Sequence, residues 1–240
     1  MRHARHGTGP TGYAAIDGVH SLNPMQLTAA WLRHILAASL LLCLAASPAA
    51  PVLAQDTSAP AAIVNALHDK LIEVMKNARE LGFQGRFKAL EPVVSQNFDT
   101  PLIAKVILSR YWDELTDTQK AEFIELFRRL SVATYASRFN SYDSESFVSL
   151  TSEELNKGRL LLKTEMRSPG KKPVELDYLM HEQDGKWLII SVIANGVNDL
   201  SLKRAEYAAV IKDKGYPALV GEIEGKIQDM EKGKDAADSL

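Results

Sequence analysis

The stretch between Asn97 and Trp112 is rich in apolar residues and predicts a deeply buried helix. Its apolar side chains fall on nearly every side of a helical projection, with few polar interruptions. A helix that is apolar almost all round is buried on several sides or faces an apolar ligand. Asp99 before Pro101 marks the helix start, because aspartate can accept from free amides and proline costs nothing in a first turn.

A second helix is predicted directly afterwards and runs up to a polar turn that begins at Ser141. Thr116 and Gln119 have the spacing of a capping box at its start. One of its faces is mostly aromatic and apolar and consists of Phe123, Phe127, Leu130 and Thr134. Two such helices in tandem suggest the wall of a hydrophobic chamber.

Further helices are expected on both sides of this pair. An amphipathic pattern covers residues 61–81, and a shorter helix should end near Asn97. Near the C-terminus, apolar positions at helical spacing predict helices over residues 202–214 and 216–230, with Gly215 between them.

The hydrophobic period changes to two in the region between these helices, which predicts β-strands. The expected strands are residues 147–150, 159–166, 174–180 and 186–194. Asp184-Gly185 is a strong hairpin signal. The last strand is apolar on both faces, so we expect it to be central and covered on both sides. The order of elements predicts an α+β fold, in which a curved antiparallel sheet of about four strands packs against N-terminal and C-terminal helices.

The beginning of the chain has the three-part layout of a secretory signal peptide. Arg33 and His34 precede an apolar run over residues 35–46, and Val52-Leu53-Ala54 fits a cleavage site before Gln55. A retained N-terminal anchor helix is the alternative, and either Met1 or Met25 could be the start. We expect a leader and signal peptide over 1–54, a linker over 55–60, one domain over 61–232 and a polar tail over 233–240.

Charge and cysteine content narrow the possible functions. Removing residues before Gln55 takes away three of 28 basic and one of 30 acidic residues, which leaves a net charge of −4. This balance argues against nucleic acid as the main partner. The single cysteine, Cys43, lies in the apolar run, so the mature chain would have no disulfide and no thiol chemistry.

The sequence shows little sign of catalytic chemistry. The two histidines after the leader, His68 and His181, have no acidic or cysteine neighbours at ligand spacing, so we expect no metal and no cofactor. Nucleophile-elbow, phosphate-loop and dinucleotide motifs are missing from the sequence. The apolar and aromatic surface is instead larger than a thin two-layer core needs, which would suit a ligand made mostly of hydrocarbon.

Several short motifs resemble the MlaC / toluene-tolerance family of periplasmic lipid-binding proteins. They include Phe98-Asp99, the run from Leu108 to Trp112, Thr134-Tyr135-Ala136 and Trp187, and Ser109 stands where the family often has glycine. The C-terminal segment from Asn195 is more similar to the hopanoid-biosynthesis-associated branch, HpnM. The resemblance therefore leaves the ligand open between a phospholipid and a hopanoid.

The resemblance implies an NTF2-like fold that encloses an apolar pocket, and a non-enzymatic carrier. Such a carrier would be the soluble component of an ABC-type lipid transport system that maintains outer-membrane asymmetry. It would pass lipid between an inner-membrane ABC transporter complex and an outer-membrane lipoprotein complex. The expected lipid-binding residues are Ile103, Val106, Ile107, Tyr111, Phe127, Leu130, Leu162, Tyr178, Trp187, Ile189 and Ile193, with Arg110 and Lys163 at the pocket mouth.

Two other functions remain open from the sequence. An enzyme or accessory factor acting on a hopanoid or isoprenoid would need ionisable groups that converge in the pocket. The nearest candidates for such groups are Asp99, Asp177 and Glu165. A periplasmic adaptor that binds only protein would instead have a filled core without a cavity.

Overall fold

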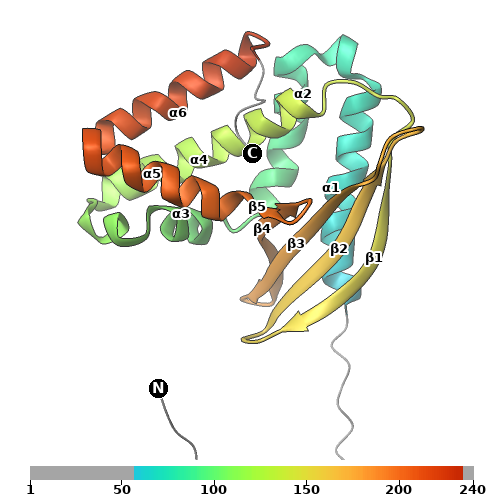
Figure 1. The fold of residues 1–240 in the computed structure, drawn as a ribbon, viewed down its shortest axis with the longest axis horizontal. Helices are drawn as coiled ribbons and strands as arrows, with labels where there is room; N and C mark the ends of the chain where they lie inside the picture. The colour runs from blue at the N-terminus through green and yellow to red at the C-terminus, as the bar shows by residue number, and fades with distance from the viewer. Residues whose placement is uncertain (1–56, 235–240) are drawn as a thin grey trace, which may run out of the picture. The chain divides into compact units, whose positions relative to one another are not determined.

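The computed structural model describes residues 57–234, which form six α-helices, one 3-10 helix and a five-stranded antiparallel sheet (Figure 1). The helices are α1 (Ser58–Lys76), α2 (Ala78–Asn97), α3 (Thr100–Leu108), η1 (Ser109–Glu114), α4 (Asp117–Arg138), α5 (Asp199–Lys214) and α6 (Tyr216–Glu231). The strands are β1 (Ser146–Leu155), β2 (Arg159–Arg167), β3 (Val174–Gln183), β4 (Lys186–Ala194) and β5 (Val197–Asn198). The α+β prediction is therefore confirmed. The predicted leader, its cleavage site and Cys43 lie outside the described residues.

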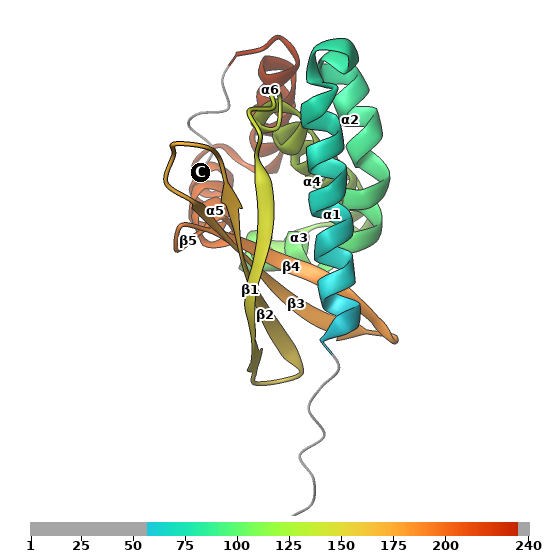
Figure 2. The ribbon, with the colours of Figure 1, turned by 90° about the vertical axis from the view of Figure 1, so that its right-hand side faces the viewer.

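The first two helices form an antiparallel pair beside the sheet (Figure 2). The predicted 61–81 helix is shifted, because α1 begins at Ser58, inside the expected linker, and ends at Lys76. The chain turns at Asn77, and α2 contains a kink at Gly82, where φ is +56°. A positive φ is costly for residues with a side chain, so glycine allows the bend. Arg86 holds the bend by donating hydrogen bonds to the carbonyl oxygens of Ala78 (2.9 Å) and Ala136 (2.8 Å).

The apolar central segment is divided into two helices. Asp99 caps α3 as predicted, since its Oδ1 accepts from the Leu102 amide at 3.0 Å. The helix does not continue to Trp112, however, because Ser109 has φ +52° and ψ −122°. The chain continues from there as the 3-10 helix η1. The capping box of α4 is confirmed, with both the Thr116 and the Gln119 side chains in place.

The sheet order is β1-β2-β3-β4-β5, so each strand pairs with its neighbour in sequence. Two strand predictions need correction. The first strand is ten residues long and not a short piece over 147–150. The apolar strand β4 is not central, because its outer neighbour is the two-residue β5. Beyond β5, the free edge of β4 takes an isolated bridge from Phe98 to Ile189, and α3 and α5 lie beside it.

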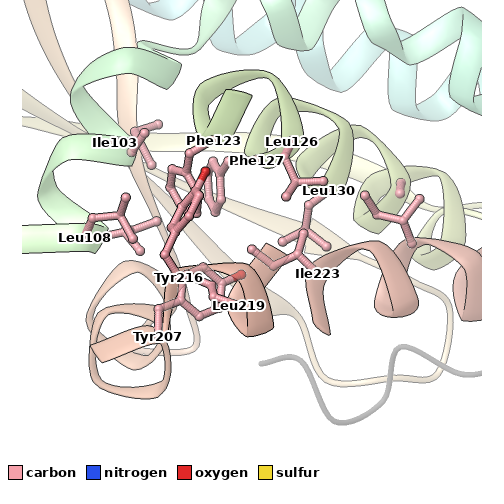
Figure 3. Packing of buried hydrophobic residues seen from close by; sticks show 14 of the residues in the cluster. Ile103, Leu108, Phe123, Leu126, Phe127, Leu130, Tyr207, Tyr216, Leu219 and Ile223 are labelled. Carbon is pink, nitrogen blue, oxygen red and sulfur yellow. The ribbon is translucent and has the colours of Figure 1, made fainter. Parts of the chain in front are cut away.

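The buried side chains form two clusters that meet at α4. One cluster joins α1, α2 and one side of α4 to the helix-facing side of the sheet. The other joins α3, the opposite side of α4, α5 and α6. In Figure 3, Phe123 and Phe127 from α4 face Tyr207 from α5 and Tyr216 from α6. Within residues 57–234, no helix combines the length and apolarity needed to cross a membrane.

Candidate functional site

A cavity of about 350 Å³ lies between the two clusters. Its walls come from α3, α4, the start of α5 and the helix-facing side of β2 to β4. Most of the lining is apolar and includes Met75, Phe98, Phe139, Ile190 and Leu200. Pockets that hold small molecules usually enclose about 300–1,000 Å³ of mostly apolar surface with a few polar groups. The cavity therefore has the size and the character of a binding site for an apolar ligand.

The hollow exists because the helices cover only one end of the inner sheet face. Leu160, Met180 and Ile189 occupy one cross-strand row. They are almost completely buried against the cluster that contains α1 and α2. Toward the β2–β3 turn, Leu176 and Ala194 pair in another row and remain partly exposed. Side chains at this uncovered end border the cavity, namely Met166, Val174, Leu176, Val192 and Ala194.

Four charged side chains border the cavity, and Asp199 interacts electrostatically with both Arg138 and Lys203. Arg138 ends α4, Asp199 and Lys203 lie in the first turns of α5, and Glu145 precedes β1. Lys203 Nζ donates to Asp199 Oδ1 at 2.8 Å, with only 12% of the lysine side chain exposed. Burial lowers the pKa of Arg138, although the negative charge of Asp199 opposes this shift. The neighbouring Ser141 is exposed, so we place the opening of the cavity on this charged side.

Hydroxyl groups in the lining are mostly engaged with the protein itself. Ser131 and Thr134 donate to carbonyl oxygens one turn earlier in α4, at 2.9 and 2.8 Å. Ser191 donates to Asn198 Oδ1 at 3.2 Å. Tyr178 shares a 3.0 Å hydrogen bond with the buried His68 Nε2. Tyr135 also borders the cavity, and its ring packs edge-on against Phe98 and stacks with Phe139.

His68 anchors the part of the cavity wall that Tyr178 forms. Its ring stacks on Phe147 with centroids 4.0 Å apart and rings inclined by 8°. Burial lowers the pKa of His68 to about 4, so the ring is neutral at pH 7. Burial also raises the pKa of Tyr178 well above its usual value. The pair is therefore uncharged, as an apolar wall requires.

The structure brings five of the predicted lipid-binding residues to the cavity, and their role in binding a lipid stays a prediction. These five are Ile103, Ile107, Phe127, Leu130 and Tyr178. Three more predicted residues, Leu162, Trp187 and Ile189, belong to the closely packed cluster under α1 and α2 instead. Val106 of α3 is not in the lining and has 36% of its surface exposed, and Tyr111 is buried in η1.

Ile193 lies outside the lining because β4 contains a bulge. Met180 pairs with Ile189, but Leu179 pairs with Ser191, so Ile190 is an extra residue. The bulge reverses the alternation, and Val192 pairs with Tyr178 while Ile193 pairs with Asp177. Val192 therefore takes the inward position that uninterrupted alternation gave to Ile193.

The two residues expected at the pocket mouth lie elsewhere. Arg110 donates to the hydroxyl of Tyr111 at 2.8 Å, away from the cavity. Lys163 is on the outer face of the sheet, opposite Asp177, and forms an ion pair with Glu153 at 3.4 Å. The structure places Arg138 and Lys203 at the cavity instead. Helical spacing relates both to other lining residues, because Arg138 follows Thr134 by one turn and Lys203 follows Asp199 by one turn, but this spacing alone does not distinguish them from surface cations.

The three carboxylates considered for an enzyme do not converge in the cavity. Asp99 caps α3 and contacts His181 Nε2 at 2.8 Å. Asp177 and Glu165 lie in the sheet rows that alternate with the inward-facing ones, and burial raises the pKa of Asp177. Among the described residues, no three His, Cys, Asp or Glu side chains are grouped as a metal site would require.

Comparison with known proteins finds relatives over most of the chain. The family described as MlaC protein matches residues 65–225, which is more than half of the sequence. The toluene tolerance protein ttg2D of Pseudomonas putida is 26% identical over 211 residues, covering 85% of this chain and 95% of that protein. A solved structure of a phospholipid-binding protein from Ralstonia solanacearum, in complex with a phospholipid, has a TM-score of 0.63 at 17% identity. That match covers 70% of this chain and 97% of the other, and it shows a shared fold.

Proposed function

The chain belongs to the MlaC protein family, and on that premise we propose that it is a periplasmic carrier of a membrane lipid. The observation that carries the proposal is the cavity of about 350 Å³ with an apolar wall and charged groups on one side. A lipid has the same division between hydrocarbon and polar head group. Burial of hydrocarbon contributes roughly 0.8 kcal/mol per CH₂, so an acyl chain could be held without a charged clamp inside.

The proposed route connects the two membranes. The carrier receives lipid from one membrane complex and delivers it to another, with an inner-membrane ABC transporter complex and an outer-membrane lipoprotein complex as transient partners. The signal-peptide pattern before Gln55 supports the periplasm as the compartment.

The ligand is a phospholipid or a hopanoid. The name of the Ralstonia protein, which was solved with a phospholipid, supports the first. Similarity of the segment after Asn195 to the HpnM branch supports the second. In the structure this segment forms β5, α5 and α6, and it supplies Asp199, Leu200 and Lys203 to the cavity.

The alternatives are less well supported. A protein-only adaptor is expected to have a filled core, whereas this core contains a cavity. For an enzyme acting on a hopanoid or isoprenoid, Asp99, Asp177 and Glu165 are absent from the cavity lining.

The test is to express the full chain with its leader, purify the protein gently from the periplasmic fraction and extract it with organic solvent. Mass spectrometry should find close to one lipid per protein and should distinguish a phospholipid from a hopanoid. Repeated absence of lipid, together with failure to take up lipid from vesicles of the host's own lipids, would remove the carrier proposal.

A further inference from the structure

Tyr135 carries the one hydroxyl group inside the cavity for which the described residues provide no hydrogen bond. The hydroxyls of Ser131, Thr134, Ser191 and Tyr178 are bonded to protein atoms. Ser141 is exposed to solvent and is not enclosed in the cavity. A polar group that is removed from water and finds no hydrogen-bond partner costs free energy. A ligand that accepts a hydrogen bond from the Tyr135 hydroxyl should therefore bind more tightly than a ligand that cannot.

The phenol is neutral at physiological pH and can donate a hydrogen bond. Burial raises the pKa of Tyr135, and the negative charge of Asp199 raises it further, whereas Arg138 opposes the shift. The hydroxyl therefore keeps its proton and presents a donor to the cavity.

The position of Tyr135 along α4 indicates which ligand atom it meets. Phe127 and Leu130 line the apolar part of the cavity, Tyr135 follows, and Arg138 comes next at the charged side. Tyr135 and Arg138 are three residues apart, so they lie on one helix face and are separated by about 4.5 Å along the helix axis. Along α4 the cavity therefore offers first an apolar wall, then the Tyr135 hydroxyl and then the Arg138 cation. A glycerophospholipid has its acyl chain, ester carbonyl and phosphate in the same order.

We propose that Tyr135 donates a hydrogen bond to the ester carbonyl of the bound lipid and thereby favours ester-linked lipids over lipids that lack an acceptor at this depth. The inference rests on the proposed carrier function and specifies its ligand chemistry. The hydrogen bond from Tyr135 joins two neutral groups, so it should raise the affinity for the lipid by about three- to tenfold.

Two single-chain probes with the same head group test this selectivity. They are palmitoyl lysophosphatidylcholine, which has an ester, and its hexadecyl ether analogue, whose oxygen is a weaker acceptor. The wild-type protein, stripped of lipid, should bind the ester about three- to tenfold more tightly than the ether. Tyr135→Phe keeps the ring contacts with Phe98 and Phe139 and should bind both probes equally, because only its affinity for the ester falls. The control Ser131→Ala, which removes an engaged lining hydroxyl, should preserve the wild-type ratio.

Unfolding of the lipid-free protein gives an independent readout. Tyr135→Phe removes no protein hydrogen bond, so the free energy of unfolding should stay the same or rise. A clear loss of stability would reveal a protein partner for the hydroxyl and overturn the inference. The inference would also be overturned if Tyr135→Phe had the same ratio of ester to ether affinity as the wild type. In that case the carrier function would still be supported, because the wild type binds the probes. If the wild type binds neither probe, this inference is overturned, whereas the carrier function is decided separately by lipid extraction from the purified protein.

Discussion

At the scale of single residues, His68 links the stability of the protein to pH. Burial lowers the pKa of His68 to about 4, whereas an unfolded chain has a histidine pKa near 6.5. Between these values the unfolded state holds a proton that the folded state does not. Stability is therefore full above about pH 6.5 and is lost as the pH falls toward 4.

We predict that the wild-type protein loses about 2 kcal/mol of unfolding free energy between pH 7.5 and pH 5 through this residue. The measurement is urea unfolding at both values. In His68→Gln, which can still hydrogen-bond to Tyr178, this part of the loss should disappear, so the difference between the variants isolates the effect. Equal pH dependence in both proteins would show that His68 is not buried and neutral.

Residue identity in the sequence revealed only part of the cavity. Ile103, Phe127 and Tyr178 could be chosen because helical and strand periodicity assigned them to inward faces. Arg138 and Lys203 could not be separated from ordinary surface cations, because their place depends on where α4 ends near the start of α5. The sequence pattern contains charge and spacing, but not the distance between two helices.

At the scale of elements, the break between α3 and η1 depends on a strained residue. Ser109 has φ +52° and ψ −122°, a conformation that glycine adopts far more readily than serine. Such strain costs on the order of 1–3 kcal/mol. We predict that Ser109→Gly raises the free energy of unfolding by about 1 kcal/mol, measured by chemical denaturation.

The serine also makes a contact that glycine would lose. Arg204 donates to Ser109 Oγ at 2.8 Å, but the bond is exposed and contributes little. Ser109→Ala removes the same bond and keeps the strain, so it should be equal to or slightly less stable than the wild type. Equal stability of the glycine and alanine variants would contradict the strain argument.

The elements themselves were largely predictable, and the exceptions have a common cause. The limits of β4 and the capping residues of α3 and α4 follow from local sequence signals. The bulge at Ile190 and the pairing of β5 arise from contacts between strands, so alternation alone misassigned Ile193. Local patterns do not contain the register of a neighbouring strand.

At the scale of the whole described unit, α4 separates two packed clusters that do not fill the space between them. The helices bury one end of the inner sheet face and leave the other end open to the cavity. Protein interiors that bind no ligand are close-packed. A cavity with an apolar wall is therefore typical of a ligand-binding site. The central claim is that this hollow, and not the outer surface, holds the lipid.

Two neighbouring residues of β4 provide the most direct test. Val192 lines the cavity, whereas Ile193 pairs with Asp177 on the opposite face of the sheet. Lipid per protein should be measured by mass spectrometry after purification of wild type, Val192→Trp and Ile193→Trp, with folding checked by thermal unfolding. We predict close to one lipid per protein in wild type and Ile193→Trp. In folded Val192→Trp we predict at least a tenfold loss of bound lipid, because a tenfold weaker affinity corresponds to roughly the loss of a few CH₂ contacts. Full lipid content in folded Val192→Trp, or loss only in Ile193→Trp, would contradict it.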